Sequence, residues 1–390
     1  MSQRSATRGL LLSGGGARAA YQAGALRRIA EICEQHHGGG GRIPFEILVG
    51  ASAGAINLAV LASHACDFQG AVRIMCGKWE EITTSQVYDA RATRIAVNAF
   101  RWFLDLAFGG AVNLDEPRAR ALVDTAPLLR LLEGILDPHK VAENINRGAV
   151  EAVAVSATDY STGAHTVFVQ SHGERTLWRR FSRVSQYDVI TPRHILASCA
   201  IPILFPAVRI GNTFYGDGSI RNTAPLSPAV HLGARKILAI GVREMLTTQI
   251  TPPPERGNTH YPSPARISGV LLDSIFLDAL EIDREQMMRV NRILESIPGP
   301  VSDNRGVRMR PIDFLYLGPS KSLARIAIQH RDEIPRSIRH MLQGLGAKHA
   351  SGGDFLSYLL FEKGYCRELM DLGYSDAKAR SEEIREFLWT

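Results

Sequence analysis

The sequence predicts an α/β protein, a three-layer α/β/α sandwich around a central, mainly parallel sheet. The first observation is an apolar run, Gly9 to Leu12, that ends in three glycines and precedes a stretch rich in helix formers, Ala17 to Glu34. The same order repeats, with Phe45 to Val49 as a buried strand, a turn of small residues, and Ala55 to Ala65 as an apolar helix. Strands that alternate with helices are joined by crossovers, which place helices on both faces of a parallel sheet.

Short apolar segments bounded by turn residues extend the expected sheet beyond these two strands. They are Ala152 to Ser156, Thr166 to Gln170, Val208 to Tyr215, Ile237 to Val242 and Phe314 to Leu317. Residues 67–147 have a mostly helical pattern and are expected to form an insertion or cap. Within them, the aromatic and basic stretch Ile95 to Phe108 is typical of a packed amphipathic helix, and also of a cap that touches lipid.

The expected organisation is one domain over residues 8–250 and a mostly helical C-terminal region over residues 251–390 that completes or extends it. A proline-rich stretch marks the boundary and contains Pro252, Pro253, Pro254, Pro262 and Pro264. After it, Ala265 to Ile297 is expected to be a long helical segment. A surface loop is expected from His36 to Arg42, which contains four consecutive glycines.

The composition is that of a folded globular protein, with 45% hydrophobic and 22% charged residues among 390. The net charge of +6 favours anionic surfaces, but no basic run concentrates it, so no nucleic-acid partner is expected. Five cysteines without a Cys-x-x-Cys pair predict neither a disulfide framework nor a zinc site and fit a reducing cytoplasm. No apolar run reaches the length of about 18 residues that a membrane span needs, so any membrane contact is expected to be peripheral.

Gly50-x-Ser52-x-Gly54 lies between a predicted strand and a predicted helix, which is the setting of a nucleophile elbow. Small neighbours allow the strained turn that lifts a serine hydroxyl, and they let a substrate carbonyl approach closely. The helix N-terminus behind Ser52 also favours developing negative charge. On its own the pattern is more typical of a turn in which the serine caps its helix, so the interpretation depends on context.

The motif Gly14-Gly15-Gly16-Ala17-Arg18 is the first such context. It leaves backbone N–H groups free of side chains at the start of a helix, as an oxyanion hole requires, and Arg18 can orient the loop or add positive charge. Gly14-x-Gly16-x-x-Ala19 also matches the dinucleotide-binding fingerprint. That fold needs an acidic residue at the end of its second strand to bind the ribose, and Gly50-Ala51-Ser52 stands there instead. A nucleotide-dependent oxidoreductase is therefore disfavoured.

Asp217-Gly218-Ser219 is the second context, because an aspartate at a strand end can reach a serine at the end of a neighbouring strand. A hydrolase with the order Ser, Asp, His would have its histidine downstream of the acid. Five histidines occur there, and none has a distinctive setting: His231, His260, His330, His340 and His349. The residues alone leave the base of Ser52 open.

The three motifs in this order resemble the patatin-like phospholipases, in their bacterial form, which are serine acyl hydrolases. The resemblance covers about residues 8–241 and extends to Ala197-Ser198-Cys199-Ala200-Ile201-Pro202, Phe205-Pro206, Asn222 and Pro225. It implies a serine that an aspartate activates directly, with Ser52 as the acylated nucleophile and Asp217 as its general base. It also implies Gly14, Gly15, Gly16, Ala17 and Arg18 as the oxyanion loop, Gly50 and Gly54 as the flanks of the elbow, and Gly218 and Ser219 as the Asp-Gly motif.

The activity that the resemblance implies is hydrolysis of a carboxylic ester of a lipid through an acyl-enzyme, with no metal or other cofactor. A phospholipid, a lysophospholipid or another acyl ester is the expected partner, met in the cytoplasm or at a membrane surface; the oligomeric state is left open. Two positions depart from the family pattern, Ala19 and Ser219, where glycine and a small apolar residue are usual. The hydroxyl of Ser219 can hydrogen-bond to Asp217 and lower its basicity. A non-catalytic lipid-binding or regulatory protein is therefore the alternative.

Overall fold

The computed structural model describes residues 6–38, 41–108, 121–173, 177–245, 261–302, 308–344, 346 and 352–390. Several positions singled out in the sequence lie outside these residues: Gly39 and Gly40 of the expected glycine loop, Pro252 to Pro254 of the expected boundary, His260 and His349.

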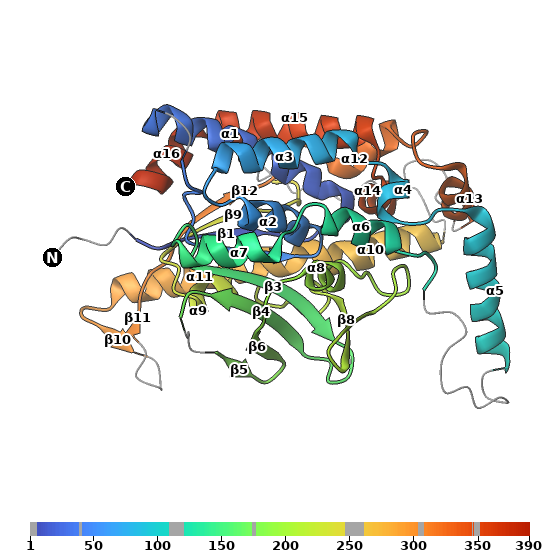
Figure 1. Cartoon of the computed structure of the whole chain (residues 1–390), viewed down its shortest axis with the longest axis horizontal. Coiled ribbons are helices and arrows are strands. Elements are labelled where there is room, and N and C mark those ends of the chain that lie inside the picture. Colours follow the sequence, from blue (N-terminus) through green and yellow to red (C-terminus); the bar gives the residue numbers. More distant parts are fainter. Residues whose placement is uncertain are drawn as a thin grey trace.

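A ten-stranded sheet runs through the centre of the molecule (Figure 1). Its strand order is β12 (Asp313–Leu317), β9 (Lys236–Ile240), β1 (Arg8–Leu12), β2 (Ile47–Ala51), β3 (Ala152–Asp159), β4 (His165–Ser171), β6 (Arg183–Tyr187) and β5 (Arg179–Arg180), while β8 (Thr213–Asp217) pairs with β3 and with β7 (Val208–Ile210). All pairings from β12 to β3 are parallel. Beyond them the sheet is mixed, because β4 and β8 both run antiparallel to β3.

Alternating side chains along the central strands explain why both faces of the sheet are covered. Leu10 and Leu12 of β1 belong to one hydrophobic cluster, whereas Leu11 between them belongs to another. The next strand repeats the pattern, with Leu48 in the first cluster and Ile47 in the second. Because successive side chains of a strand point to opposite faces, a strand that is apolar throughout is stable only between two layers of helices.

Helices form the two outer layers, which confirms the expected α/β class (Figure 1). The layer above the sheet in Figure 1 includes α1 (Ala20–His37), α2 (Ala53–Ser63), α3 (Phe68–Glu81), α7 (Pro138–Asn146) and α15 (Lys363–Ala379), and the second face is covered by α9 (Ser227–His231) and α11 (Ala279–Ser296). The remaining elements are η1 (Gly16–Ala19), α4 (Thr84–Val87), α5 (Ala92–Phe108), α6 (Ala126–Glu133), α8 (Pro192–Ser198), α10 (Pro264–Asp273), η2 (Ser274–Asp278), α12 (Leu323–Gln329), α13 (Arg336–Gly344), α14 (Gly353–Leu359), α16 (Ser381–Trp389) and the small pair β10 (Val301–Ser302) and β11 (Arg308–Met309).

The expected strands agree with the observed ones within a few residues, with one correction. Val208 to Tyr215 is not a single strand, because the chain reverses at Gly211, whose φ of +58° lies in the left-handed region that favours glycine. The two halves form the hairpin β7–β8. Strands β5 and β6 were not predicted, since the arginines at 179, 180 and 183 hide the apolar alternation that identifies a strand.

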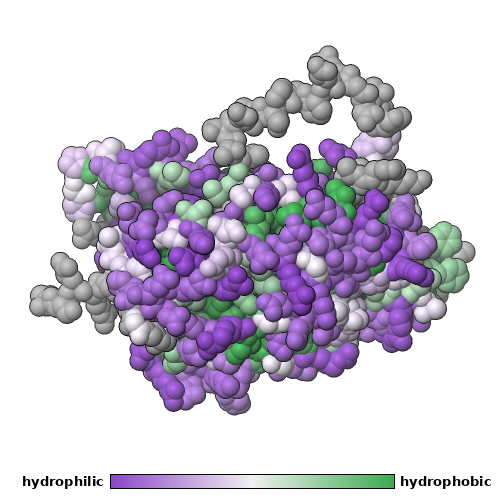
Figure 2. All heavy atoms as spheres, turned by 90° about the horizontal axis from the view of Figure 1, so that it is seen from above, coloured by the Kyte–Doolittle hydropathy of each residue, from purple (hydrophilic) through white to green (hydrophobic). Residues whose placement is uncertain are grey.

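The long helical segment expected from Ala265 to Ile297 is confirmed as α10, η2 and α11, with a π-helical turn at η2. None of the described helices has the length and apolar character needed to cross a bilayer. The outer face of the α1, α3 and α15 layer is largely hydrophilic, and apolar side chains gather at the right-hand end, where α5 stands (Figures 1 and 2).

The C-terminal residues pack directly against the N-terminal ones. β12 extends the sheet beside β9, and α15 lies along α1. The helices of this pair approach so closely that a Cβ at Gly373 of α15 would overlap the carbonyl oxygen of Tyr21, and one at Gly24 of α1 would overlap the carbonyl oxygen of Met370. Glycine at both positions is therefore required by the packing of these two helices.

We expect Gly373→Ala to lower the free energy of unfolding by about 3 kcal/mol or more, because the added methyl group meets backbone rather than a movable side chain. Gly77→Ala in α3 is the matched control, since a Cβ there meets no atom within 4 Å. In that helix interior the same change should stabilise the protein by about 0.5–1 kcal/mol. Urea unfolding of both variants checks this, and equal effects would contradict the close packing of α1 and α15.

Candidate active site

Ser52 stands on the sharp turn between β2 and α2. Its backbone adopts φ 50° and ψ −132°, a conformation that L-residues rarely adopt and that stores strain. The turn is also tightly packed, since a Cβ at Gly54 would overlap the carbonyl oxygen of Leu12, and one at Gly50 would lie 2.9 Å from the Cα of Ala55. The Gly-x-Ser-x-Gly pattern thus has the strained strand-to-helix geometry of a nucleophile elbow.

Asp217, at the end of β8, accepts a hydrogen bond from the hydroxyl of Ser52. The Oγ to Oδ2 distance is 2.6 Å, although 165 positions separate the two residues. Both side chains are buried, with 2% and 0% of their surface exposed. The sheet brings them together, because β2 and β8 both pair with β3, at Ala51↔Ser156 and Ala157↔Asp217.

Two hydroxyl groups that the sequence did not single out for a role hold this pair in place. Ser198 at the end of α8 accepts a hydrogen bond from the backbone N–H of Ser52 at 2.9 Å. Thr158 on β3 donates its hydroxyl to the backbone carbonyl of Asp217 at 2.7 Å. Ser198 belongs to the Ala-Ser-Cys-Ala-Ile-Pro segment, so its motif was noticed, but nothing in the pattern indicated that its hydroxyl reaches Ser52.

Burial raises the pKa of Asp217 to about 7, and hydrogen bonds from Ser52 and Ser219 oppose that rise. The backbone N–H of Ser219 donates to Oδ1 of Asp217 at 2.8 Å. Any residue with a backbone N–H at position 219 could make this backbone bond; the hydroxyl of Ser219 lowers the pKa of Asp217 less than the backbone bond does, and burial outweighs both. A carboxylate that exchanges its proton near neutral pH is suited to act as a general base in this range.

Gly14 and Gly15 have backbone N–H groups without a partner among the described residues, and Gly14 lies against Ser52. Both residues are buried, and within the described part of the chain neither N–H group has a hydrogen-bond acceptor. A Cβ at Gly14 would lie 2.9 Å from the Cβ of Ser52. Since buried N–H groups are rarely left unpaired, two free donors on a loop that packs against Ser52 through Gly14 form a candidate oxyanion site.

Gly16 and Ala17 begin the short helix η1 behind these donors, and both are buried. Gly16 has a φ of +57°, and a Cβ there would overlap the carbonyl oxygen of Tyr358 in α14. The third glycine of the motif is thus required by the backbone conformation and by the C-terminal helix that packs on it.

Arg18 is buried and joins the glycine loop to two C-terminal helices. Its Nε donates to the hydroxyl of Ser357 at 2.7 Å, and its guanidinium lies 4.0 Å from the centre of the Tyr358 ring. Its Nη atoms lie 3.2 Å from a carboxylate oxygen of Asp273 and 3.8 Å from one of Asp354. With two carboxylates beside it, Arg18 is placed to orient the loop rather than to present free positive charge.

A buried chain of amide groups supports the strand ends below the glycine loop. Gln22 donates to the carbonyl oxygens of Ser13 and Ile240, at 2.9 and 3.0 Å, and accepts a hydrogen bond from Asn57 at 3.0 Å. Asn57 in turn accepts a hydrogen bond from the indole N–H of Trp79 at 2.7 Å. Every side-chain donor and acceptor of Gln22 and Asn57 therefore has a partner, which makes this row of amides rigid. No short motif identifies such residues in a sequence.

The segment that contains η2 covers the candidate dyad of Ser52 and Asp217. Phe276 is 5% exposed and lies against Gly14, where a Cβ would come within 3.0 Å of its ring. A cavity of about 20 Å³ lies between Phe276, Gly14, Ala51 and Ser219, which is room for about one water molecule. π-Helical turns such as η2 often occur at functional sites.

No histidine in the described residues hydrogen-bonds to Ser52 or Asp217. His231 stacks on Trp178, His330 lies between Glu333 and Glu368, and His340 bonds to its own helix. The described residues also contain no cluster of three or more His, Cys, Asp and Glu side chains suited to a metal ion.

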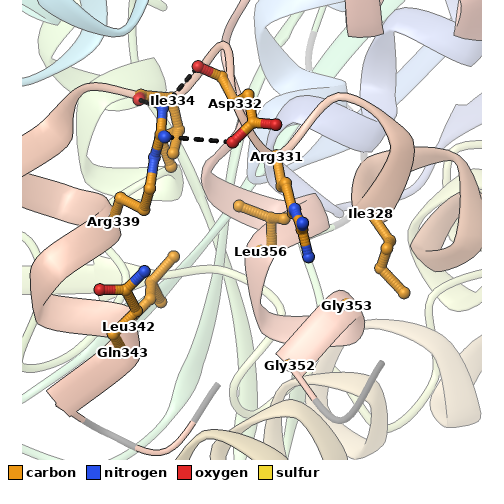
Figure 3. A pocket seen from close by; sticks show the side chains of 10 residues that line it. All are labelled: Ile328, Arg331, Asp332, Ile334, Arg339, Leu342, Gln343, Gly352, Gly353 and Leu356. Atoms are coloured by element: carbon orange, nitrogen blue, oxygen red, sulfur yellow. Dashed lines mark hydrogen bonds and ion pairs between the residues drawn. The ribbon is translucent and has the colours of Figure 1, made fainter. Parts of the chain in front are cut away.

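A larger cavity, of about 350 Å³, lies between α12, α13 and α14 (Figure 3). Arg331 and Leu356 line it, and an ion pair between Arg339 and Asp332 borders it. None of the candidate catalytic or oxyanion residues lines this cavity. Helix α14 separates this cavity from the glycine loop. Ser357 and Tyr358, which follow Leu356 in α14, contact Arg18 of that loop.

Comparison with known proteins places the three motifs in one family match. A family model described as patatin-like phospholipase matches residues 10–230, from β1 to α9. No curated protein matches the chain. Among solved structures, VipD from Legionella pneumophila is similar over 94% of this chain and 67% of its own, at 14% identity and a TM-score of 0.32.

We expect Asp217→Asn to raise the free energy of unfolding at pH 8. The pKa of Asp217 is raised in the folded protein, so its contribution to stability is full below the unfolded pKa near 4 and is lost as pH rises through about 7. Asparagine carries no charge and avoids that loss, so the variant should be more stable than wild type by about 2–4 kcal/mol at pH 8. The difference in the free energy of unfolding should shrink below about pH 5.

Asp159→Asn is the matched control for this measurement. Burial of Asp159 is outweighed by hydrogen bonds from Ser161 and Thr162, which lower its pKa, so its asparagine should not stabilise the protein at pH 8. Chemical unfolding at several pH values checks both variants. An Asp217→Asn protein that is no more stable than wild type at pH 8 would show that Asp217 is not a destabilised buried carboxylate.

Proposed function

Because this chain belongs to the patatin-like phospholipase family, whose model matches more than half of it, we propose that it hydrolyses carboxylic esters of lipids with a Ser52–Asp217 dyad. The observation that carries the proposal is the 2.6 Å hydrogen bond between a strained serine and a buried carboxylate. Two backbone N–H groups on the glycine loop, which packs against that serine through Gly14, have no partner among the described residues and support the proposal.

In the acylation step, Asp217 takes the proton of Ser52 as Oγ attacks the ester carbonyl carbon. The electron pair of the carbonyl moves to its oxygen, and the N–H groups of Gly14 and Gly15 stabilise the resulting oxyanion. When the tetrahedral intermediate collapses, the bond to the alcohol breaks, and the departing oxygen takes the proton from Asp217. Ser52 is left acylated.

Deacylation reverses the roles, with water in place of the alcohol. Asp217 takes a proton from the water as its oxygen attacks the acyl carbon, and the same N–H groups hold the second oxyanion. Collapse breaks the bond to Oγ, and Ser52 recovers its proton from Asp217. The products are a fatty acid and the free alcohol of the lipid.

The geometry favours this chemistry over nucleotide binding. Gly14, Gly15 and Gly16 pack against Ser52, Val242 and Tyr358, and the adjoining cavity of about 20 Å³ has no room for a pyrophosphate. The same cavity is too small for an acyl chain, so substrate entry requires Phe276 and η2 to move away from Gly14. A lipid-binding role without catalysis would not need the strained backbone of Ser52.

We also propose that residues 251–390 complete the domain of residues 8–250 instead of forming a separate one. β12 extends the central sheet, α14 supplies the partners of Arg18, and α15 packs along α1. If the C-terminal region were separate, Gly373→Ala would leave the unfolding of the remainder of the chain unchanged.

We expect wild-type protein to react covalently with a fluorophosphonate probe, and Ser52→Ala to lose the label completely. Asp217→Asn should label at least roughly 100-fold more slowly, because general-base assistance is worth two to four orders of magnitude. Mass spectrometry of the labelled peptide locates the adduct. Equal labelling of wild type and Ser52→Ala, both shown to be folded by circular dichroism, would refute the proposal. Full labelling of Asp217→Asn would instead point to a different base.

The pH dependence of ester hydrolysis tests the role of Asp217. Because the base must be ionised, kcat/KM for a soluble ester should fall about tenfold per pH unit below the midpoint and level off above pH 7 or so. Ser219→Ala removes a hydroxyl whose hydrogen bond lowers the pKa of Asp217, so the midpoint should move to higher pH while the plateau stays within a few-fold of wild type. A shift to lower pH would contradict this account of Ser219.

A further inference from the structure

A short hairpin at the end of the sheet combines basic and aromatic exposed side chains. Arg180 and Arg183 pair across it, and Phe181 and Ser182 form its turn. Phe181 is fully exposed, at 107% of its reference surface. We call residues 179–183 the Phe181 hairpin. A single exposed apolar side chain is common on protein surfaces, so the neighbours of Phe181 decide whether it belongs to a contact surface.

The register of the sheet places this hairpin at the same edge as the dyad. Arg183 pairs with His165, His165 with Thr158, and Thr158 with Gly216, the neighbour of Asp217. These residues form one row across β6, β4, β3 and β8. Three strand spacings therefore separate Arg183 from Gly216, a distance of roughly 14 Å. The turn at Phe181 projects from the edge at which the dyad lies.

Two more aromatic side chains are exposed at this edge. Tyr160 follows β3 and is 45% exposed, and Phe214 on β8 is 48% exposed. They are adjacent, since the N–H of Tyr160 donates to the carbonyl oxygen of Phe214 at 3.0 Å. Tyr160 also covers Gly216, where a Cβ would overlap its ring. Exposed aromatic groups thus lie at both ends of this row, at the hairpin and beside Gly216.

Two charges of the hairpin are available to a partner. Within the described residues, Arg179 and Arg180 form no ion pair, whereas Arg183 faces the carboxylate of Asp283 and opposes the rise of its pKa by burial. On α5, Arg94 pairs with Asp89 and Asp124, and Phe100 and Phe103 are also exposed. The hairpin differs from α5 in its place, because it lies at the edge of the sheet that holds Ser52 and Asp217.

We propose that the Phe181 hairpin, with Tyr160 and Phe214, docks the protein on an anionic phospholipid surface. Arginine binds phosphate groups through its planar fork, and each basic residue near an anionic bilayer adds to binding. Aromatic rings prefer the headgroup level of a membrane, which favours lipid over a nucleic acid. The purpose of docking rests on the proposed function, since it brings ester bonds to the edge that holds Ser52; the binding itself does not depend on catalysis.

Vesicle binding by the full-length Ser52→Ala protein tests the proposal without lipid hydrolysis. Vesicles of phosphatidylcholine are compared with vesicles that also contain phosphatidylserine, by co-sedimentation at low and high salt. We expect preference for the anionic vesicles and loss of that preference at high salt. Arg179→Gln with Arg180→Gln should weaken binding to anionic vesicles roughly tenfold or more. Phe181→Ser should weaken binding to both kinds of vesicle.

Phe103→Ser on α5 is the matched control, because it removes an equally large ring that is 62% exposed on another surface. It should leave binding unchanged. Unaltered binding by the hairpin variants would overturn the proposal, as would loss of binding by Phe103→Ser alone. The proposal would also be overturned if the protein does not bind vesicles but binds RNA and loses that binding when Arg179 and Arg180 are replaced. The hairpin would then be a nucleic-acid surface.

An activity measurement separates docking from catalysis. With Ser52 intact, Phe181→Ser should hydrolyse a soluble short-chain ester at the wild-type rate and vesicle lipids several-fold more slowly. Equal loss on both substrates would mean that the hairpin supports the site rather than docking. If wild type hydrolyses neither substrate, the proposed function fails, and the vesicle-binding comparison in the Ser52→Ala protein still decides whether the hairpin docks.

Discussion

The candidate site is organised around one buried hydrogen bond, between the hydroxyl of Ser52 and the carboxylate of Asp217. A carboxylate at this depth is costly to ionise, and this cost is what raises its pKa toward neutrality. The same burial that suits the carboxylate to the proposed role of general base therefore destabilises the fold. The strained backbone of Ser52 adds to the cost, so the surrounding sheet and helices must fix both residues rigidly.

Three parts of the chain share this task. β3 aligns β2 and β8, and with them the strand ends that carry Ser52 and Asp217. The amide chain from Gln22 to Trp79 fastens the ends of β1 and β9 beneath the glycine loop. Arg18 ties that loop to α10 and α14. Ser357 of α14, a partner of Arg18, lies in the C-terminal third of the sequence. The candidate oxyanion loop is therefore shaped by a residue more than 300 positions away.

The closed site and the exposed hairpin are complementary features of the same edge of the sheet. Phe276 excludes most water from the dyad, which maintains the low-dielectric surroundings that the raised pKa of Asp217 reflects. At the rim, Phe181, Phe214 and Tyr160 expose aromatic surface to solvent. The buried hydroxyl and carboxylate and the exposed aromatic side chains thus lie within a few strand spacings of each other.

The sequence by itself determined the alternation of strands and helices, because apolar periodicity and glycine turns are local properties, and it predicted the motifs around Gly14, Ser52 and Asp217. Two strand predictions failed for local reasons. Gly211 and Asn212 form a hairpin turn inside the segment predicted as one strand, and β5 and β6 carry arginines where a strand signal needs apolar residues. Tertiary structure alone decided that Ser198 and Thr158 hold the candidate dyad and that Arg18 faces α14. Their hydroxyl and guanidinium groups act over contacts that only folding creates, and no spacing in the sequence encodes them.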